Sequence, residues 1–120
     1  MHLSLASDEF GRLTCLITNG PEKGIATSSD VPRAASGLLE ALESIEKSGL
    51  GECFWIEGGG EYRWVFRRDG DRVRVALMWS SGTMTGWEHV FWGECLLDDL
   101  ARNVREQLAS VSVAPRATAG

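Results

Sequence analysis

Few residues of this chain have the types and spacing that acid–base or nucleophilic chemistry requires. Glu57, Glu61 and Glu88 lie near the ends of predicted strands, and neighbouring carboxylates can shift each other's pKa and act as acid and base. They border a flat predicted sheet, however, with no sign of a pocket. His89 and Cys95 lie six residues apart on one predicted strand, roughly 20 Å at the rise of a strand, which is too far for a dyad. We therefore expect no catalytic residues and no enzymatic activity.

Metal, phosphate and redox chemistry have equally weak signals. The three cysteines, Cys15, Cys53 and Cys95, form no CxxC motif and no cluster with histidine, so we expect neither a metal site nor a disulfide framework. The glycine run 58–60 precedes a predicted strand and is not part of a GxxxxGK[ST] motif, which argues against phosphate binding. The sequence thus predicts no metal, no cofactor and a reduced, cytoplasmic setting.

Charge and length narrow the range of partners. The chain has 120 residues and a formal net charge of -5, which argues against nucleic acid because phosphate binding depends on Lys and Arg. No signal peptide is visible, and no apolar stretch approaches the ~18 residues of a membrane span, so we expect no membrane partner. The length suits one domain, predicted over residues 1–113, with a flexible tail at 114–120.

The elements that position the remaining candidate residues are organised around a predicted hairpin at residues 61–79, EYRWVFRRDGDRVRVALMW. Asp69-Gly70 is a strong signal for a two-residue type I′ turn, which places Phe66 opposite Val73. Because side chains alternate along a strand, one face of this hairpin is apolar and is expected to line the core. The residues of this face are Tyr62, Trp64, Phe66, Val73, Val75 and Leu77.

Two further strands are predicted beside this hairpin. Strand 53–57 joins it through a three-glycine loop, a register that places Phe54 and Ile56 in the core and Trp55 on the opposite face. Strand 87–95 pairs with the other side of the hairpin and places His89 on the core side. We expect Glu94, on the opposite face of that strand, to relieve repulsion between the arginines of the hairpin.

The rest of the chain supplies two helices and an N-terminal hairpin. Alternation predicts strands at residues 2–7 and 12–18, and residues 22–29 are predicted to form a loop. Helical periodicity predicts a helix that Asp30 or Ser29 caps and Gly49 ends, and a last helix from Leu97 to about Val111. The order ββαββββα predicts an α+β two-layer sandwich, an antiparallel sheet of about 5–6 strands with two helices on one face.

The face of this sheet that the helices leave bare has the most specific composition. Trp, Arg and Met are enriched at protein interfaces, and Trp and Arg are the usual hot spots. The alternative is that the N-terminal hairpin or the tail covers the face. The residues predicted to bind a partner there are Trp55, Arg63, Arg67, Arg74, Met78 and Trp92.

The C-terminal half resembles a pattern found in small uncharacterised bacterial proteins: a W-x-F-x-R-x-G-D-x-V strand pair, an aromatic strand and a closing helix that begins L-x-D-L-A-R. Some small acidic proteins of this kind are immunity proteins, which block a toxin. The resemblance therefore implies toxin neutralisation and carries over no functional residue. The residues that carry it are Trp64, Phe66, Arg68, Gly70, Asp71, Val73, Phe91, Leu97, Asp99, Leu100, Ala101 and Arg102.

These observations favour a non-enzymatic module that binds another protein, or a second copy of itself, through the bare sheet face, with toxin neutralisation as its concrete form. The alternatives are a dimeric protein similar to a secretion chaperone, and a small-molecule binder or weak enzyme with a pocket between sheet and helices. Oligomeric state tests the first alternative, and a pocket that contains His89 or the glutamates tests the second.

Overall fold

The computed structural model describes residues 1–82 and 86–119, which contain seven strands and two helices in the order βββαββββα. The elements are β1 (His2–Ser7), β2 (Leu13–Asn19), β3 (Glu22–Ser28), α1 (Val31–Ser48), β4 (Leu50–Glu57), β5 (Gly60–Asp69), β6 (Arg72–Ser81), β7 (Glu88–Leu96) and α2 (Leu97–Ala119).

The predicted α+β class with antiparallel pairing is confirmed, but the strands form two sheets instead of one. Strands β1, β2 and β3 make a three-stranded sheet, and β4 to β7 make a four-stranded sheet. The segment predicted as a loop at 22–29 is strand β3. Asn19 pairs with Glu22, so the Gly20-Pro21 pair, which looked like the end of a hairpin, is a two-residue turn into a third strand.

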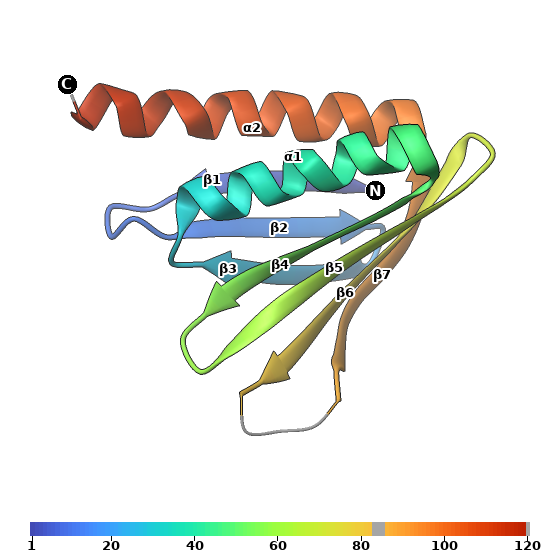
Figure 1. Cartoon of the computed structure of the whole chain (residues 1–120), viewed down its shortest axis with the longest axis horizontal. Coiled ribbons are helices and arrows are strands. Elements are labelled where there is room, and N and C mark those ends of the chain that lie inside the picture. The colour runs from blue at the N-terminus through green and yellow to red at the C-terminus, as the bar shows by residue number, and fades with distance from the viewer. Residues whose placement is uncertain (83–85, 120) are drawn as a thin grey trace.

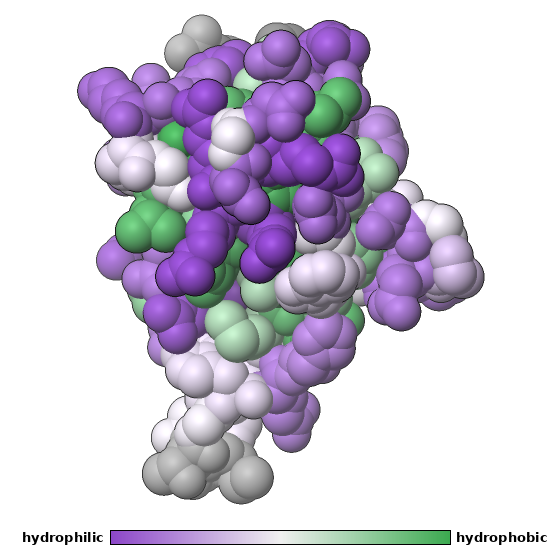
Figure 2. Space-filling model, turned by 90° about the vertical axis from the view of Figure 1, so that its right-hand side faces the viewer, coloured by the Kyte–Doolittle hydropathy of each residue, from purple (hydrophilic) through white to green (hydrophobic). Residues whose placement is uncertain are grey.

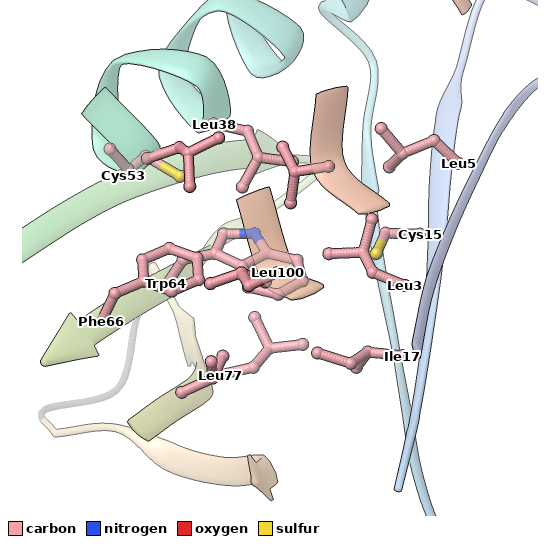
Figure 3. Packing of buried hydrophobic residues seen from close by; sticks show 14 of the residues in the cluster. Leu3, Leu5, Cys15, Ile17, Leu38, Cys53, Trp64, Phe66, Leu77 and Leu100 are labelled. Atoms are coloured by element: carbon pink, nitrogen blue, oxygen red, sulfur yellow. The ribbon is translucent and has the colours of Figure 1, made fainter. Parts of the chain in front are cut away.

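The two helices lie side by side along one side of the molecule, and the strands of the two sheets run at an angle to each other beneath them (Figure 1). Side chains from the three-stranded sheet, such as Leu3 and Ile17, face Trp64 and Leu77 of the four-stranded sheet (Figure 3). Leu38 of α1 and Leu100 of α2 belong to the same cluster, which therefore joins all the layers of the fold in one core.

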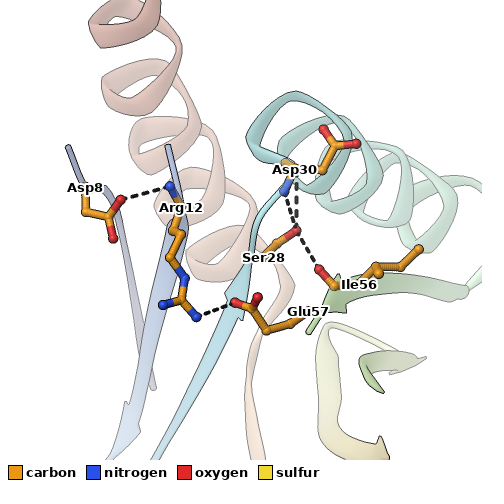
Figure 4. Close-up of polar contacts among 6 residues, drawn as sticks. All are labelled: Asp8, Arg12, Ser28, Asp30, Ile56 and Glu57. Atoms are coloured by element: carbon orange, nitrogen blue, oxygen red, sulfur yellow. Dashed lines mark hydrogen bonds and ion pairs between the residues drawn. The ribbon is translucent and has the colours of Figure 1, made fainter. Parts of the chain in front are cut away.

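Strand β3 lies against both edges of the four-stranded sheet. A Cβ atom built on Gly24 of β3 would lie 2.8 Å from Cβ of Phe91 on β7, so only glycine allows this approach. At the other end of β3 the Ser28 hydroxyl donates to the carbonyl of Ile56 at 3.3 Å, and Arg12 pairs with Glu57 at 2.8 Å (Figure 4). These polar contacts join the two sheets next to β4.

The predicted ends of the first helix are confirmed. The side chain of Asp30 accepts a hydrogen bond from the backbone N–H of Arg33. Pro32 occupies the first turn, where a backbone N–H would have no partner within the helix, so its absence costs no hydrogen bond. Gly49 ends the helix in the left-handed conformation with φ of 85°. The guanidinium of Arg68 on β5 donates to the carbonyl of Glu46 at 3.5 Å, which ties the end of α1 to the four-stranded sheet.

Helix α2 protects the free edge of strand β1. The side chain of Asn103 accepts from the backbone N–H of Leu3 at 2.8 Å and donates to its carbonyl at 2.9 Å. Gln107 accepts from the N–H of Leu5 at 2.9 Å. An unpaired strand edge invites pairing with other chains, so these amides close the edge of the three-stranded sheet.

The last helix is longer than predicted. It continues to Ala119 instead of ending near Val111, so it includes most of the predicted tail 114–120; Gly120 lies outside the described residues. No helix in the described part of the chain combines the length and the hydropathy that a membrane span requires.

The central hairpin has the predicted faces in a different register. Asp69 pairs with Arg72, so the turn residues are Gly70 and Asp71, and Phe66 lies opposite Val75. Gly70 has a φ of 66°, and glycine at the first central position is the signature of a type II′ turn. The pairing differs from the predicted one by two residues. A shift of two preserves the alternation, and Trp64, Phe66, Val73, Val75 and Leu77 are buried as predicted.

The prediction for strand β4 is wrong, because its register is shifted by one residue. Gly60 belongs to β5 and pairs with Glu57, so the loop has two residues instead of three. A one-residue shift moves every side chain to the other face. Trp55 is therefore fully buried, with its ring centroid 5.4 Å from that of Trp64, whereas Phe54 and Ile56 are exposed on the outer face.

The expected core position of His89 is also wrong. The pairing of β6 with β7 is irregular between Leu77 and Met78: Leu77 pairs with Phe91, and Met78 pairs with His89. Such a bulge leaves one residue of β7 unpaired and reverses the alternation beyond it. His89 is consequently exposed next to Met78, on the side of the sheet away from the core.

Candidate functional site

The candidate site is the outer face of the four-stranded sheet, the side that points away from the common core. The antiparallel registers arrange its residues in rows that run across β4, β5, β6 and β7. Its residues are Leu50, Glu52, Phe54 and Ile56 on β4, Glu61, Arg63, Val65, Arg67 and Asp69 on β5, Arg72, Arg74, Ala76, Met78 and Ser80 on β6, and His89, Trp92, Glu94 and Leu96 on β7.

Five of the six residues predicted to bind a partner lie on this outer face. Arg63, Arg67, Arg74, Met78 and Trp92 are all there, and each is exposed or half-buried. The sixth, Trp55, is excluded, since it is fully buried in the core.

An arginine that packs against two neighbouring aromatic rings forms the most organised part of the outer face. The guanidinium carbon of Arg63 lies 5.9 Å from the ring centroid of Phe54 and 5.7 Å from that of Trp87, and the two rings are 6.2 Å apart. The Nε of Arg63 donates to Glu52 at 2.7 Å. Cation–π contact and a charge-assisted hydrogen bond thus fix a side chain that is otherwise flexible. We call Glu52, Phe54, Arg63 and Trp87 the arginine–aromatic cluster.

Apolar side chains continue from this cluster across the middle of the sheet. Glu52, Val65, Ala76 and Trp92 form one row, and Arg63 and Met78 are paired in the next. Trp92 is 52% exposed, and no aromatic ring is recorded beside it in the described part of the chain. Trp92 thus adds the large apolar surface of an exposed indole to this part of the face.

The arginines nearest the β5–β6 turn differ in whether a carboxylate pairs with them. Arg72 donates to Glu94 at 2.5 Å, so the expected pairing of these two residues is present, but Arg72 lies opposite Asp69 and not opposite Arg67. The carboxyl of Glu94 has a lowered pKa because of its hydrogen bond with Arg72, with a smaller contribution from the charge of Arg74. Arg67 lies directly opposite Arg74 and has no carboxylate partner among the described residues. Two like charges face each other there, which is unfavourable.

Sequence reasoning missed three residues of this site. Phe54 and Ile56 were expected in the core, and Trp87 received no role. In β4 both alternate sets are apolar, with Cys53 and Trp55 on one face and Phe54 and Ile56 on the other, so periodicity cannot separate them. The length of the glycine turn could have separated them. A two-residue turn at Gly58-Gly59 pairs Glu57 with Gly60 and places Trp55 inward and Phe54 outward.

The three glutamates considered for acid–base chemistry are not brought together. Glu57 and Glu88 lie on β4 and β7, at opposite edges of the sheet and roughly 14 Å apart at ordinary strand spacing. Glu61 is on the outer face. The pKa of Glu57 is lowered, chiefly by a hydrogen bond from Thr27 and then by Arg12. A general acid at neutral pH requires the opposite shift.

The cysteines have the properties of packed residues. All three are buried as free thiols. Burial raises the pKa of Cys15, and it raises that of Cys53 to about 12 and that of Cys95 to about 11. A thiol with so high a pKa is a poor nucleophile at neutral pH. Within residues 1–82 and 86–119 no group of three or more His, Cys, Asp or Glu side chains is placed to hold a metal ion.

The surface chemistry is mixed rather than continuously apolar. On the side of the molecule shown in Figure 2, hydrophobic residues form separate patches among hydrophilic ones. This mixture is typical of interfaces whose partners also exist alone. Comparisons with protein-family models, with curated proteins and with solved structures found no match to this chain, so the geometry of the outer face is the basis for the functional conclusion.

Proposed function

We propose that this protein is a protein-binding module and that its binding surface is the outer face of the four-stranded sheet. The observation that carries the proposal is the arginine–aromatic cluster, in which Arg63 packs against both Phe54 and Trp87. Arg and Trp contribute disproportionately to binding energy. Because Arg63 is already held in place, a partner loses little side-chain entropy when it docks there.

The neighbouring residues extend this surface. Trp92 and Met78 provide apolar area that a partner removes from water, worth about 25 cal/mol per Å². Charged residues at the margins, among them Glu94 and Arg74, set orientation and speed association. These features support protein binding in general. Toxin neutralisation by occlusion, the concrete form that the resemblance implied, stays a prediction.

A capture experiment tests the proposal. The chain is immobilised as wild type, as the outer-face variant Arg63→Ala/Trp92→Ala, and as the control Leu16→Ala/Ile25→Ala. The control removes two exposed apolar side chains from the outside of the three-stranded sheet. Each is exposed to lysate of the source cell and to a differently tagged copy of the chain, and circular dichroism checks that all three are folded.

We expect wild type and control to retain the same specific protein or proteins and the outer-face variant to lose them. Equal retention by all three would place binding elsewhere and contradict the proposal. Failure of folded wild type to retain any protein, including its own tagged copy, would contradict it as well.

A further inference from the structure

The middle strand of the outer face has an arrangement of charges that suggests its occupant. Strand β5 presents Glu61, Arg63, Val65, Arg67 and Asp69 outward, in that order. Arg63 is paired with Glu52. Neither Glu61 nor Arg67 has an ion pair in the described part of the chain. The outward side of β5 therefore carries a carboxylate, Glu61, and a guanidinium, Arg67, that have no ion-pair partner among the described residues of the same copy.

These two charges are symmetric about the middle of the strand. Glu61 and Arg67 are each three residues from Trp64, which places them roughly 20 Å apart. Consider two copies whose outer faces meet. A two-fold axis that lies in the plane between the two sheets, perpendicular to the strands and level with Trp64, puts position 61 of one copy over position 67 of the other. The same operation repeats the match, because every contact in an isologous interface occurs twice.

The same axis matches apolar residues on the flanking strands, while it places Arg63 over Val65 and Glu52 over Phe54. On β6 it superposes Ala76 on Met78, and on β4 it superposes Leu50 on Ile56, so that apolar residues meet apolar residues. An axis parallel to the strands would instead bring Arg67 over Arg74 of the second copy, which is repulsive. Packed sheets are rotated by about 30°, which displaces the outer strands but hardly the strand on the axis.

The charge balance of the outer face permits contact with a second copy. Four arginines and four carboxylates lie on the outer face, so its formal charge is zero although the whole chain carries -5. Two copies can therefore meet through this face without net repulsion at the contact. The residues in this balance are Arg63, Arg67, Arg72 and Arg74, and Glu52, Glu61, Asp69 and Glu94.

We infer that the partner of the outer face is a second copy of this chain, in an isologous dimer whose β5 strands run antiparallel across the interface and whose Arg67 and Glu61 form two reciprocal ion pairs. This inference rests on the proposed function, because it takes the outer face as the binding surface and specifies what binds. The ion pairs would also compensate the unfavourable Arg67–Arg74 neighbour pair within each copy.

A charge-exchange experiment tests the dimer. Mass is measured by light scattering and sedimentation over a dilution series for wild type, Arg67→Glu, Glu61→Arg, an equimolar mixture of these two variants, and the control Lys23→Glu. Lys23 is an exposed residue of β3 on the other sheet. Wild type and control should have twice the 13.1 kDa mass of one chain.

Each single variant should associate at least about tenfold more weakly, because it places two pairs of like charges across the interface. The mixture should recover the dimer, because each variant supplies the charge that the other lacks. Circular dichroism shows whether both variants remain folded. If either fails to fold, Arg67→Gln and Glu61→Gln replace them, and each should weaken the dimer without reversing a charge.

Three results would overturn the inference: a monomeric wild type, a dimer that the two variants leave intact, or two weakened variants whose mixture stays monomeric. These results leave the proposed function standing if the outer-face variant Arg63→Ala/Trp92→Ala still loses a captured protein. Retention of all captured proteins by that variant would contradict the proposed function instead.

Discussion

The two sheets present different outer faces, although single residues on them are equally exposed. Ile25 on the three-stranded sheet is 53% exposed, and Trp92 on the four-stranded sheet is 52% exposed. Around Ile25 the residues are mostly small or hydroxylated. They are Ser4, Ala6, Thr14, Leu16, Thr18, Lys23 and Thr27. Trp92 lies opposite Ala76 on β6, and Arg74 and Met78 are the outward residues on either side of Ala76.

The difference shows that exposure alone does not identify a binding surface. Scattered aliphatic residues among threonines are ordinary on a soluble protein. The outer face of the four-stranded sheet combines large apolar groups with arginines that ion pairs and rings hold in place, as Arg63 is held. Such groups bury much area with little loss of conformational entropy. Composition and order, more than area, are the basis on which this face is proposed as the binding surface.

The largest expected effect tests which face of β4 points inward. Trp55→Ala should lower the free energy of unfolding by about 3–5 kcal/mol, because it leaves a cavity beside Trp64. Phe54→Ala, one residue away on the outer face, should cost less than about 1 kcal/mol. Urea unfolding of both variants measures the two values. The opposite order would mean that β4 has the register first expected from the sequence.

The contrast within β4 also shows the limit of sequence reasoning for this fold. In β5 and β6 one alternate set is apolar and the other charged, as with Trp64 and Arg63, so the buried face is evident even when the register is misjudged by two residues. In β4 both sets are apolar. Its inward face depends on whether the glycine turn has two or three residues, which alternation does not encode.

Two other differences between the predicted and the observed structure have local causes. Strand β3 was missed because its alternation is weak: a buried glycine, Gly24, takes the place of an apolar side chain where the two sheets approach each other. His89 was misplaced because a bulge beside Met78 adds one residue to β7. Most of the candidate site was nevertheless predicted. Arg63, Arg67, Arg74 and Met78 lie on strands with clear alternation, and Trp92 lies on the part of β7 beyond the bulge, where the predicted faces hold.

A smaller effect compares the two outer faces directly. Trp92→Ala should weaken self-association by about 2 kcal/mol or more, roughly thirtyfold, as expected for a hot-spot indole. Leu16→Ala removes a residue that is 38% exposed on the other sheet and should leave association unchanged. Sedimentation at several concentrations measures both. Equal effects of the two substitutions would remove the distinction between the faces.

The smallest expected effect concerns the polar contact that joins the two sheets, where Arg12 pairs with Glu57. The pKa of Glu57 is lowered by its contacts with Thr27 and Arg12, so the charged form is stabilised in the folded state. This stabilisation is present above the unfolded pKa of about 4.5 and is lost as pH falls through the lower, folded value. Because the Arg12 side chain is half exposed, Glu57→Gln should cost less than about 1 kcal/mol at pH 7.

Unfolding free energies of wild type and Glu57→Gln should therefore differ at neutral pH and converge in acid, below the pKa of Glu57 in the folded state. Glu9→Gln provides the control, since Glu9 is exposed and has no ion pair among the described residues; its difference from wild type should stay small throughout. A difference for Glu57→Gln that grows in acid would mean that protonation strengthens the contact. In that case the carboxylate would not be the form that joins the two sheets, and their alignment would depend on Ser28 and on the core alone.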